Sequence, residues 1–191
     1  MVAEEIQRNF DRAIDYFTAQ VHAVRDDQWT ASTPCSEWSV RDLVNHLTIN
    51  QLWVKPLVTD GATIAEVADT YAGDQLGDDP VAAWDRAAEA SRHAFEAPDA
   101  LDRIVHLPYG DSPAAAYCRE MMADAAIHGW DLARAIGGDE AMPNGLASAA
   151  LSEAEAHADE LAQSGMFADP MPPPADADTQ TRLLCLTGRH Q

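Results

Sequence analysis

The stretch Ala114–Gly137, AAAYCREMMADAAIHGWDLARAIG, decides the fold expected for this chain. Its small and apolar residues recur every three or four positions, which is the spacing of a helix with one buried face. A proline just before the stretch suits a first helical turn, and a pair of glycines suits the end of the helix. The sequence therefore predicts one long helix. Its buried face is expected to contain Met121, Ala125, His128, Gly129 and Leu132.

Asp124 and His128 form an unusual pair on this helix. Because they are four residues apart, their side chains lie one above the other, with roughly 5–6 Å between the Cβ atoms. Burying an ionised carboxylate is costly unless a partner charge or a metal ion compensates for it. The pair therefore indicates either a metal site or a structural Asp–His contact at the edge of the core.

The composition limits the classes of partner. The chain has 191 residues, with 12 Lys and Arg against 32 Asp and Glu, and a formal net charge of −20. A field of this sign repels phosphate backbones and anionic lipids, so we expect neither nucleic acid nor a membrane as a partner. The acidic residues are spread along the chain, which is also typical of a solvated surface.

The cysteines and the N-terminus indicate the compartment. Cys35, Cys118 and Cys185 are too few and too far apart for a disulfide framework or a CxxC metal knuckle. The start, MVAEEIQRNF, lacks the basic region and apolar core of a signal peptide, and no run of about 18 apolar residues is present. We therefore expect a cytoplasmic protein.

Four other stretches have a helical period, with an apolar stripe along one face. They cover residues 3–24, 39–57, 80–97 and 146–161. Ser39 and Asp42 approximate a capping box at the start of the second of these helices, and Pro56 is expected to bend or end it.

The remaining stretches are expected to be connections. Residues 59–79 are rich in Gly and Asp, with one short helical piece around Ile64–Val67. The segment RIVHLPYGDSP (103–113) alternates in polarity and should be a short extended connection. FADPMPPPADADTQ (167–180) should lie extended because it is rich in proline, and TRLLCLTGRHQ (181–191) should dock back on the body.

Together these elements predict an all-α protein: a four-helix bundle with extra short helices and an extended Pro-rich C-terminal segment. A chain of this length fits one domain. The bundle is expected over residues 1–166, and the Pro-rich segment and tail, docking on the bundle, over residues 167–191.

Facing helices of a bundle often hold a metal ion between them. His46 falls beside the apolar stripe of the helix at 39–57, with Asn50 one turn further on. Together with Asp124 and His128 it would supply two imidazoles and one carboxylate. This set suits Zn²⁺ in an open catalytic site, and it also suits Fe²⁺ or Ni²⁺.

Spacing alone leaves alternatives to this ligand set. Two further Glu–His pairs have the same four-residue spacing: Glu89 with His93, which is expected to be solvated, and Glu153 with His157. His106 is a reserve candidate for a ligand. A structural Asp–His pair with an unrelated core His46 would also produce the pattern.

Three blocks of the sequence resemble a known family. They are TPCSEWSVRDLVNHL (33–47), DAAIHGWDLARAIG (124–137) and the closing RLLCLTGR (182–189). These blocks resemble the actinobacterial metal-binding proteins of the mycothiol-dependent maleylpyruvate isomerase N-terminal domain type, within the wider DinB-like group. The resemblance implies a DinB-like four-helix bundle with a divalent metal on three ligands, which by position are His46, Asp124 and His128.

The chain departs from the isomerase in two ways. The isomerase has Glu, and many DinB-like proteins have His, at the position of Asp124. The isomerase also has a second, C-terminal domain, whereas here only a short tail follows the bundle. Isomerisation of maleylpyruvate is therefore not implied.

More broadly, the resemblance implies thiol chemistry. The leading hypothesis is a metal-dependent thiol transferase or isomerase, with Zn²⁺ as the expected ion and mycothiol as a cosubstrate. The alternatives are a non-catalytic metal- or small-molecule-binding bundle with a structural ion, and a bundle that has lost its metal and serves as an interaction protein. A small molecule or thiol is the expected partner, and a homodimer is left open.

Several other residues have an expected structural role. Trp38 and Trp130 are expected to be packing aromatics. Cys35 is expected to be a small buried residue and not a nucleophile, because no His or Lys lies near it in sequence. Asp131 is expected to form a surface ion pair with a neighbouring residue, although it could also orient a ligand.

Overall fold

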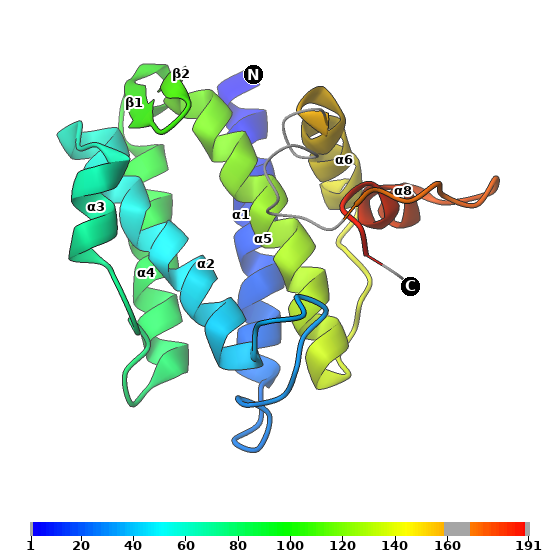
Figure 1. Cartoon of the computed structure of the whole chain (residues 1–191). Helices are drawn as coiled ribbons and strands as arrows, with labels where there is room; N and C mark the ends of the chain where they lie inside the picture. Colours follow the sequence, from blue (N-terminus) through cyan, green and yellow to red (C-terminus); the bar gives the residue numbers. More distant parts are fainter. Residues whose placement is uncertain (1, 159–168, 190–191) are drawn as a thin grey trace.

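The computed structural model describes residues 2–158 and 169–189, which are mainly helical with a small two-stranded sheet. Four long helices lie side by side (Figure 1): α1 (Val2–Ala23), α2 (Val40–Lys55), α4 (Pro80–Glu96) and α5 (Ala114–Ile136). α1 packs most extensively on α5, and α2 on α4. The predicted helical class is therefore confirmed.

Short elements complete the described chain. They are the π-helical turn η1 (Pro56–Asp60), α3 (Ile64–Thr70), the 3₁₀ turn η2 (Ala100–Asp102), β1 (Ile104–Leu107), β2 (Gly110–Pro113), α6 (Leu146–Ala156) and α8 (Thr179–Leu186). α6 packs against α5, and α8 packs against α6. The helix predicted at 146–161 ends earlier than expected, because α6 ends at Ala156 and His157 follows as its cap; residue 161, the expected end, lies outside the described residues.

Aromatic contacts join α1 to α4 in the core. The rings of Phe10 and Phe95 lie 5.0 Å apart in an edge-to-face arrangement, and those of Phe17 and Trp84 lie 4.6 Å apart. All four side chains are buried. Such ring pairs add to the free energy gained from burial alone, so they fix how these two helices sit against each other.

Gly129 lets α5 approach α1 closely. A Cβ atom at this position would lie only 2.6 Å from the ring of Tyr16 on α1. Real Cβ atoms do not come this close to a ring carbon, so the contact needs a glycine. It fixes the face of α5 that is turned to α1, and the next face of the helix carries Asp124 and His128 toward α2.

The start and end of α2 follow the local signals in the sequence. The Ser39 side chain accepts from the backbone of Asp42, and the Asp42 carboxylate accepts from the backbone of Ser39, so the predicted capping box is confirmed. The α-helix ends at Lys55, as predicted from Pro56. The chain continues as a π-helical turn closed by Gly61 at φ 68°.

Two connections carry more structure than predicted. The segment at 103–113 is extended, as predicted, but its halves pair as an antiparallel hairpin in which Ile104 lies opposite Pro113. The tail after the Pro-rich segment is helical, because α8 begins at Thr179 and buries Leu183 and Leu184.

None of the helices in the described part of the chain combines the length and the apolar character needed to cross a membrane.

Candidate functional site

Three of the predicted site residues meet between α2 and α5. His46 comes from α2, and Asp124 and His128 come from consecutive turns of α5. Their nitrogen and oxygen ligand atoms all lie within 4.8 Å of one another. Asp124 Oδ1 is 3.4 Å from His128 Nε2, and Asp124 Oδ2 is 3.8 Å from His46 Nε2. The ring centroids of the two histidines are 5.4 Å apart, so the two helices face each other here as predicted.

The three side chains differ in exposure. That of His128 is only 7% exposed, whereas Asp124 is 22% and His46 is 34% exposed. The group is therefore anchored in the core on the α5 side and accessible to solvent on the α2 side.

Trp38 lies beside both histidines. Its ring is 4.7 Å from that of His46 and 5.7 Å from that of His128. Trp38 is partly buried and comes from the loop that precedes α2. The residue predicted as a packing aromatic thus packs on the imidazoles of the site itself.

Asn50 also contacts the group. Its amide Nδ2 donates to Asp124 Oδ2 at 3.0 Å and lies 3.2 Å from His46 Nε2. Asn50 follows His46 by four residues on α2, as His128 follows Asp124 on α5. Each helix therefore contributes two residues one turn apart.

His128 is held from its other ring nitrogen by Asp131. Nδ1 of His128 donates to Asp131 Oδ2 at 2.9 Å, since a carboxylate oxygen can only accept. Asp131 also accepts from Nε and Nη2 of Arg189, at 3.2 and 2.8 Å. Both side chains are buried, so the predicted surface ion pair of Asp131 is wrong. The segment after α8 reaches the site through this contact.

The charges of the group are strongly coupled. Burial raises the pKa of Asp124, but the nearby His128 and His46 imidazoles and the Asn50 amide outweigh it, and the pKa lies well below its usual range. Burial lowers the pKa of His128, but Asp124 and Asp131 outweigh it and raise the pKa well above 6.5. The pKa of His46 is lowered, mainly by burial. His128 is thus the protonated imidazole of the pair and Asp124 the ionised carboxylate.

Cys35 lies on the Asp131 side of His128. Its Sγ donates to Asp131 Oδ2 at 3.4 Å and lies 3.8 Å from both His128 Nδ1 and Arg189 Nη2. Cys35 is partly exposed, so the expectation of a buried cysteine is wrong. Cys35, His128 and Asp131 also form a compact group. A cation there would face the guanidinium of Arg189, so the group with His46 is the better cation site.

Residues 10–133 match the family described as the mycothiol maleylpyruvate isomerase N-terminal domain. The chain belongs to this family. The resemblance predicted from the sequence blocks is thereby confirmed.

Relatives and solved structures are similar to this family member over most of its length. Two uncharacterized proteins of Mycobacterium tuberculosis, MT0763 of strain CDC 1551 and Rv0738 of strain H37Rv, are each 32% identical over 180 residues. The alignment covers 93% of this chain and 94% of the relative. Crystal structures of mycothiol-dependent maleylpyruvate isomerase, native and mutant, match with a TM-score of 0.64 at 16% identity, over 85% of this chain and 70% of that chain.

The region matched by the family covers most of the site residues but not all of them. The matched region contains the whole group of His46, Asp124 and His128, and also Asp131. Arg189 lies beyond the matched region, in the C-terminal tail of the chain. The contact from Arg189 to Asp131 therefore joins a residue outside the matched region to the group inside it.

Other histidines of this family member lie elsewhere. His106, the reserve candidate, pairs with Asp111 across the exposed hairpin at 2.7 Å and belongs to neither compact group. His157 follows the end of α6 and lies 3.4 Å from Glu153.

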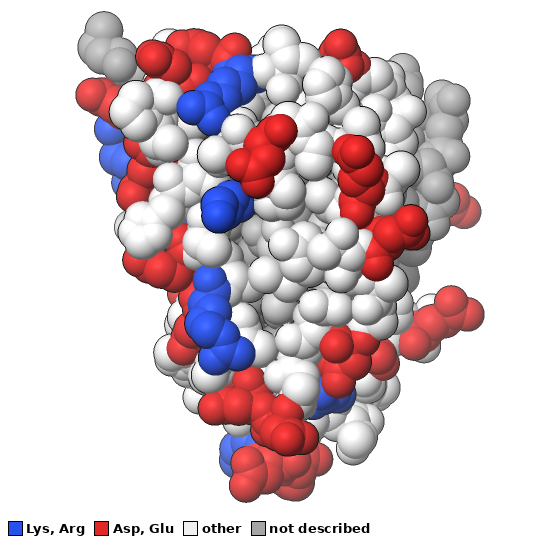
Figure 2. All heavy atoms as spheres, turned by 90° about the vertical axis from the view of Figure 1, so that its left-hand side faces the viewer, with Lys and Arg blue, Asp and Glu red and all other residues white. Residues whose placement is uncertain are grey.

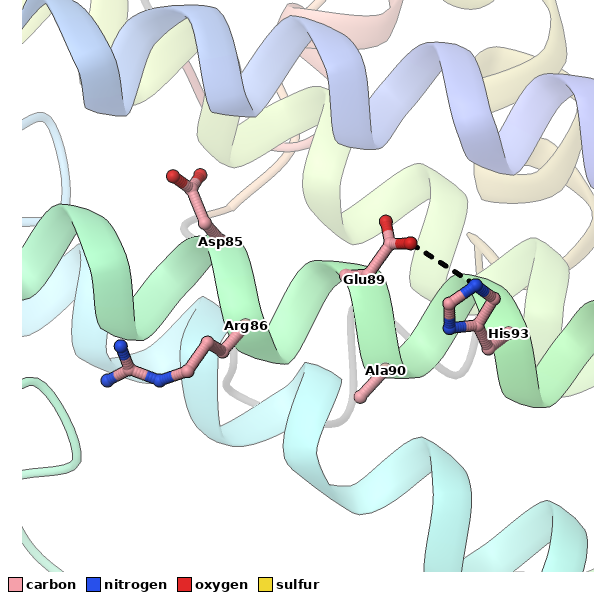
Figure 3. A pocket seen from close by; sticks show the side chains of 5 residues that line it. All are labelled: Asp85, Arg86, Glu89, Ala90 and His93. Carbon is pink, nitrogen blue, oxygen red and sulfur yellow. Dashed lines mark ion pairs between the residues drawn. The ribbon is translucent and has the colours of Figure 1, made fainter.

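An exposed hollow on α4 lies apart from both groups. The predicted solvated pair of Glu89 and His93 lies there, 3.2 Å apart with both side chains about two-thirds exposed. Figure 3 shows the side chains that line the hollow, all from α4: Asp85, Arg86, Glu89, Ala90 and His93. Glu89 and His93 form an ion pair with each other, and both side chains are open to solvent.

Two of the site contacts could not be predicted from residue spacing. Arg189 is 58 residues from Asp131, and Cys35 is 96 residues from it. Their only signal was that they belong to the sequence blocks 33–47 and 182–189. Asn50 had a local signal, because it lies one turn after His46.

Proposed function

We propose that this family member binds a divalent metal ion through His46, Asp124 and His128, and that the ion acts on a low-molecular-weight thiol or a thiol conjugate. The observation that supports this most directly is the convergence of the three ligand atoms within 4.8 Å. Zn²⁺ is the expected ion, because two imidazoles and one carboxylate are a common ligand set of open zinc sites. Ni²⁺ and Fe²⁺ would accept the same ligands.

The surroundings of His128 fit a metal ligand. Its Nδ1 is engaged by Asp131, which leaves Nε2, on the side of Asp124, for the ion. A carboxylate behind a ligating histidine fixes the ring and raises its basicity. The exposure of His46 and Asp124 leaves one side of the ion open to a further ligand.

The thiol part of the proposal comes from the relatives. The solved structure that matches is that of a mycothiol-dependent maleylpyruvate isomerase, and the description of the family also contains the word mycothiol. A thiol that coordinates zinc is deprotonated and becomes a nucleophile. S-transfer or isomerisation with a mycothiol-like thiol is the reaction class that we propose. Maleylpyruvate itself is not proposed as the substrate.

The finer fold assignment belongs to the same proposal. We classify the arrangement of α1, α2, α4 and α5 as a DinB-like four-helix bundle. The pairing of α1 with α5 and of α2 with α4, with weaker contacts between these pairs, supports that classification.

A second candidate function is a structural ion in a non-catalytic bundle. It is favoured by one observation: α2 and α5 contact each other much less than α1 contacts α5 or α2 contacts α4. An ion held by His46 on one side and by Asp124 and His128 on the other would clamp these two helices together.

A thiol titration of the cobalt-substituted protein separates these two functions. If the site is catalytic, a small thiol enters the open position of Co²⁺ and a sulfur-to-metal absorption band appears. The His46→Ala variant serves as the control without a complete site. A cobalt spectrum that no thiol changes, mycothiol included, would leave only the structural ion.

A further inference from the structure

We infer that Asn50 is a positioning residue of the metal centre, which holds the short carboxylate of Asp124 in place for the ion. This inference rests on the metal site proposed above. It adds a fourth side chain to a group for which only three were predicted.

The geometry puts the Asn50 amide between the two helices. Nδ2 of Asn50 lies 3.0 Å from Asp124 Oδ2 on α5 and 3.2 Å from His46 Nε2 on its own helix. An ionised carboxylate accepts hydrogen bonds and cannot donate, so the atom facing Asp124 must be the amide NH₂. The hydrogen bond therefore has a fixed direction, from Asn50 to Asp124.

The two oxygens of Asp124 have different partners. Oδ1 lies 3.4 Å from His128 Nε2, whereas Oδ2 accepts from Asn50. Without Asn50, Oδ2 would have no side-chain donor among the described residues within hydrogen-bond distance. The carboxylate would then be held at Oδ1 alone, by His128, and it would be less well oriented as a ligand.

The contact between Asn50 and His46 differs in kind. His46 Nε2 is the atom that would bind the ion, and a nitrogen lone pair serves only one partner. A cation must therefore replace Asn50 at His46. The bond to Asp124 can persist, because an amide carries two hydrogens and a carboxylate oxygen has two lone pairs. Asn50 thus orients the carboxylate in both states.

The test compares three variants with the native chain. Asn50→Ala removes the amide, and Asn50→Leu removes it while keeping most of the side-chain volume. Asn45→Ala is the matched control on the same helix, because Asn45 donates to Gly73 O at 3.0 Å and accepts from the Gln75 backbone at 2.8 Å, away from the site. Zinc affinity is measured by competition with a chelator, and ligand geometry by the absorption spectrum of bound Co²⁺.

We expect both Asn50 variants to bind zinc about 10–100-fold more weakly, which is the usual loss when a partner of a metal ligand is removed. Their cobalt spectra should differ from that of the native chain. Asn45→Ala should lower only the melting temperature. Native affinity and a native cobalt spectrum in both Asn50 variants would overturn the inference while leaving the metal site in place. If the native chain binds no zinc, the proposed function fails first, and this inference fails with it.

Discussion

At the scale of single residues, the site is built around His128. Its ring is buried between two carboxylates, with Nε2 3.4 Å from Asp124 and Nδ1 2.9 Å from Asp131. When one ring nitrogen of a histidine is hydrogen-bonded, the other ring nitrogen is the one left to bind a ligand. His128 is therefore oriented by the protein before any ion binds, and Asp131 supplies that orientation.

Asp131→Asn tests this role. The amide has nearly the same shape as the carboxylate, but it carries no charge to support the imidazole. We expect the zinc affinity to fall by about 10–100-fold. The control is Asp111→Asn, which changes an Asp–His pair of 2.7 Å on the exposed hairpin. Equal zinc affinities in the two variants, measured by chelator competition, would contradict the role of Asp131.

The raised pKa of His128 predicts a dependence of metal binding on pH. Because this pKa lies well above 6.5, the imidazole is protonated near neutral pH, and an ion must displace that proton. The zinc affinity should therefore rise with pH until the pKa of His128 is passed, with release of about one proton per ion. Calorimetry in buffers of different ionisation enthalpy measures this number. Binding without proton release near neutral pH would contradict the assignment.

At the scale of the elements, local signals in the sequence predicted most of the helices. The capping box of Ser39 and Asp42 starts α2, and Gly137 at φ 69° ends α5. These features depend on neighbours in sequence, so they could be read without the fold. His46 and the Asp124–His128 pair could be proposed because each falls at the edge of an apolar face.

Contacts between distant elements could not be predicted in this way. The pairing of β1 with β2 was missed, although the extended segment itself was predicted. The predicted environments of Cys35 and Asp131 were wrong, because Cys35 contacts Asp131 on α5 and Asp131 contacts Arg189 in the tail. Contacts between residues so far apart in sequence can be identified only when the fold is known.

The tail contributes to stability through Arg189. Its guanidinium is 8% exposed and bonds the fully buried carboxylate of Asp131. Removing one partner of a buried ion pair leaves the other charge uncompensated, so Arg189→Ala should lower the free energy of unfolding by about 3 kcal/mol. Arg182→Ala is the control, because Arg182 on α8 forms an exposed ion pair with Glu155 on α6. This substitution should lower the free energy of unfolding by less than about 1 kcal/mol. Equal losses in urea unfolding of the two variants would argue against a buried role for Arg189.

At the scale of the whole molecule, the charge is negative and dispersed. Figure 2 shows the face that carries α3 and α4, where Asp and Glu side chains are spread among few Lys and Arg. Such a surface fits the formal net charge of −20. The exclusion of nucleic acid as a partner stays a prediction, as does the oligomeric state. His46, whose side chain is 34% exposed, is the part of the proposed metal site that is most accessible from this acidic surface.

The central claim is tested most directly by the zinc content of the untagged protein after reconstitution and dialysis. We predict about one zinc ion per native chain, none in His46→Ala or His128→Ala, and a reduced content in Asp124→Ala. The melting temperature should fall together with the zinc content, because an ion that binds only the folded state stabilises it. Full zinc content in His46→Ala would show that this ligand is wrong and would make the group of Cys35, His128 and Asp131 the next to test. A native chain that retains no zinc, nickel or iron would contradict the account as a whole.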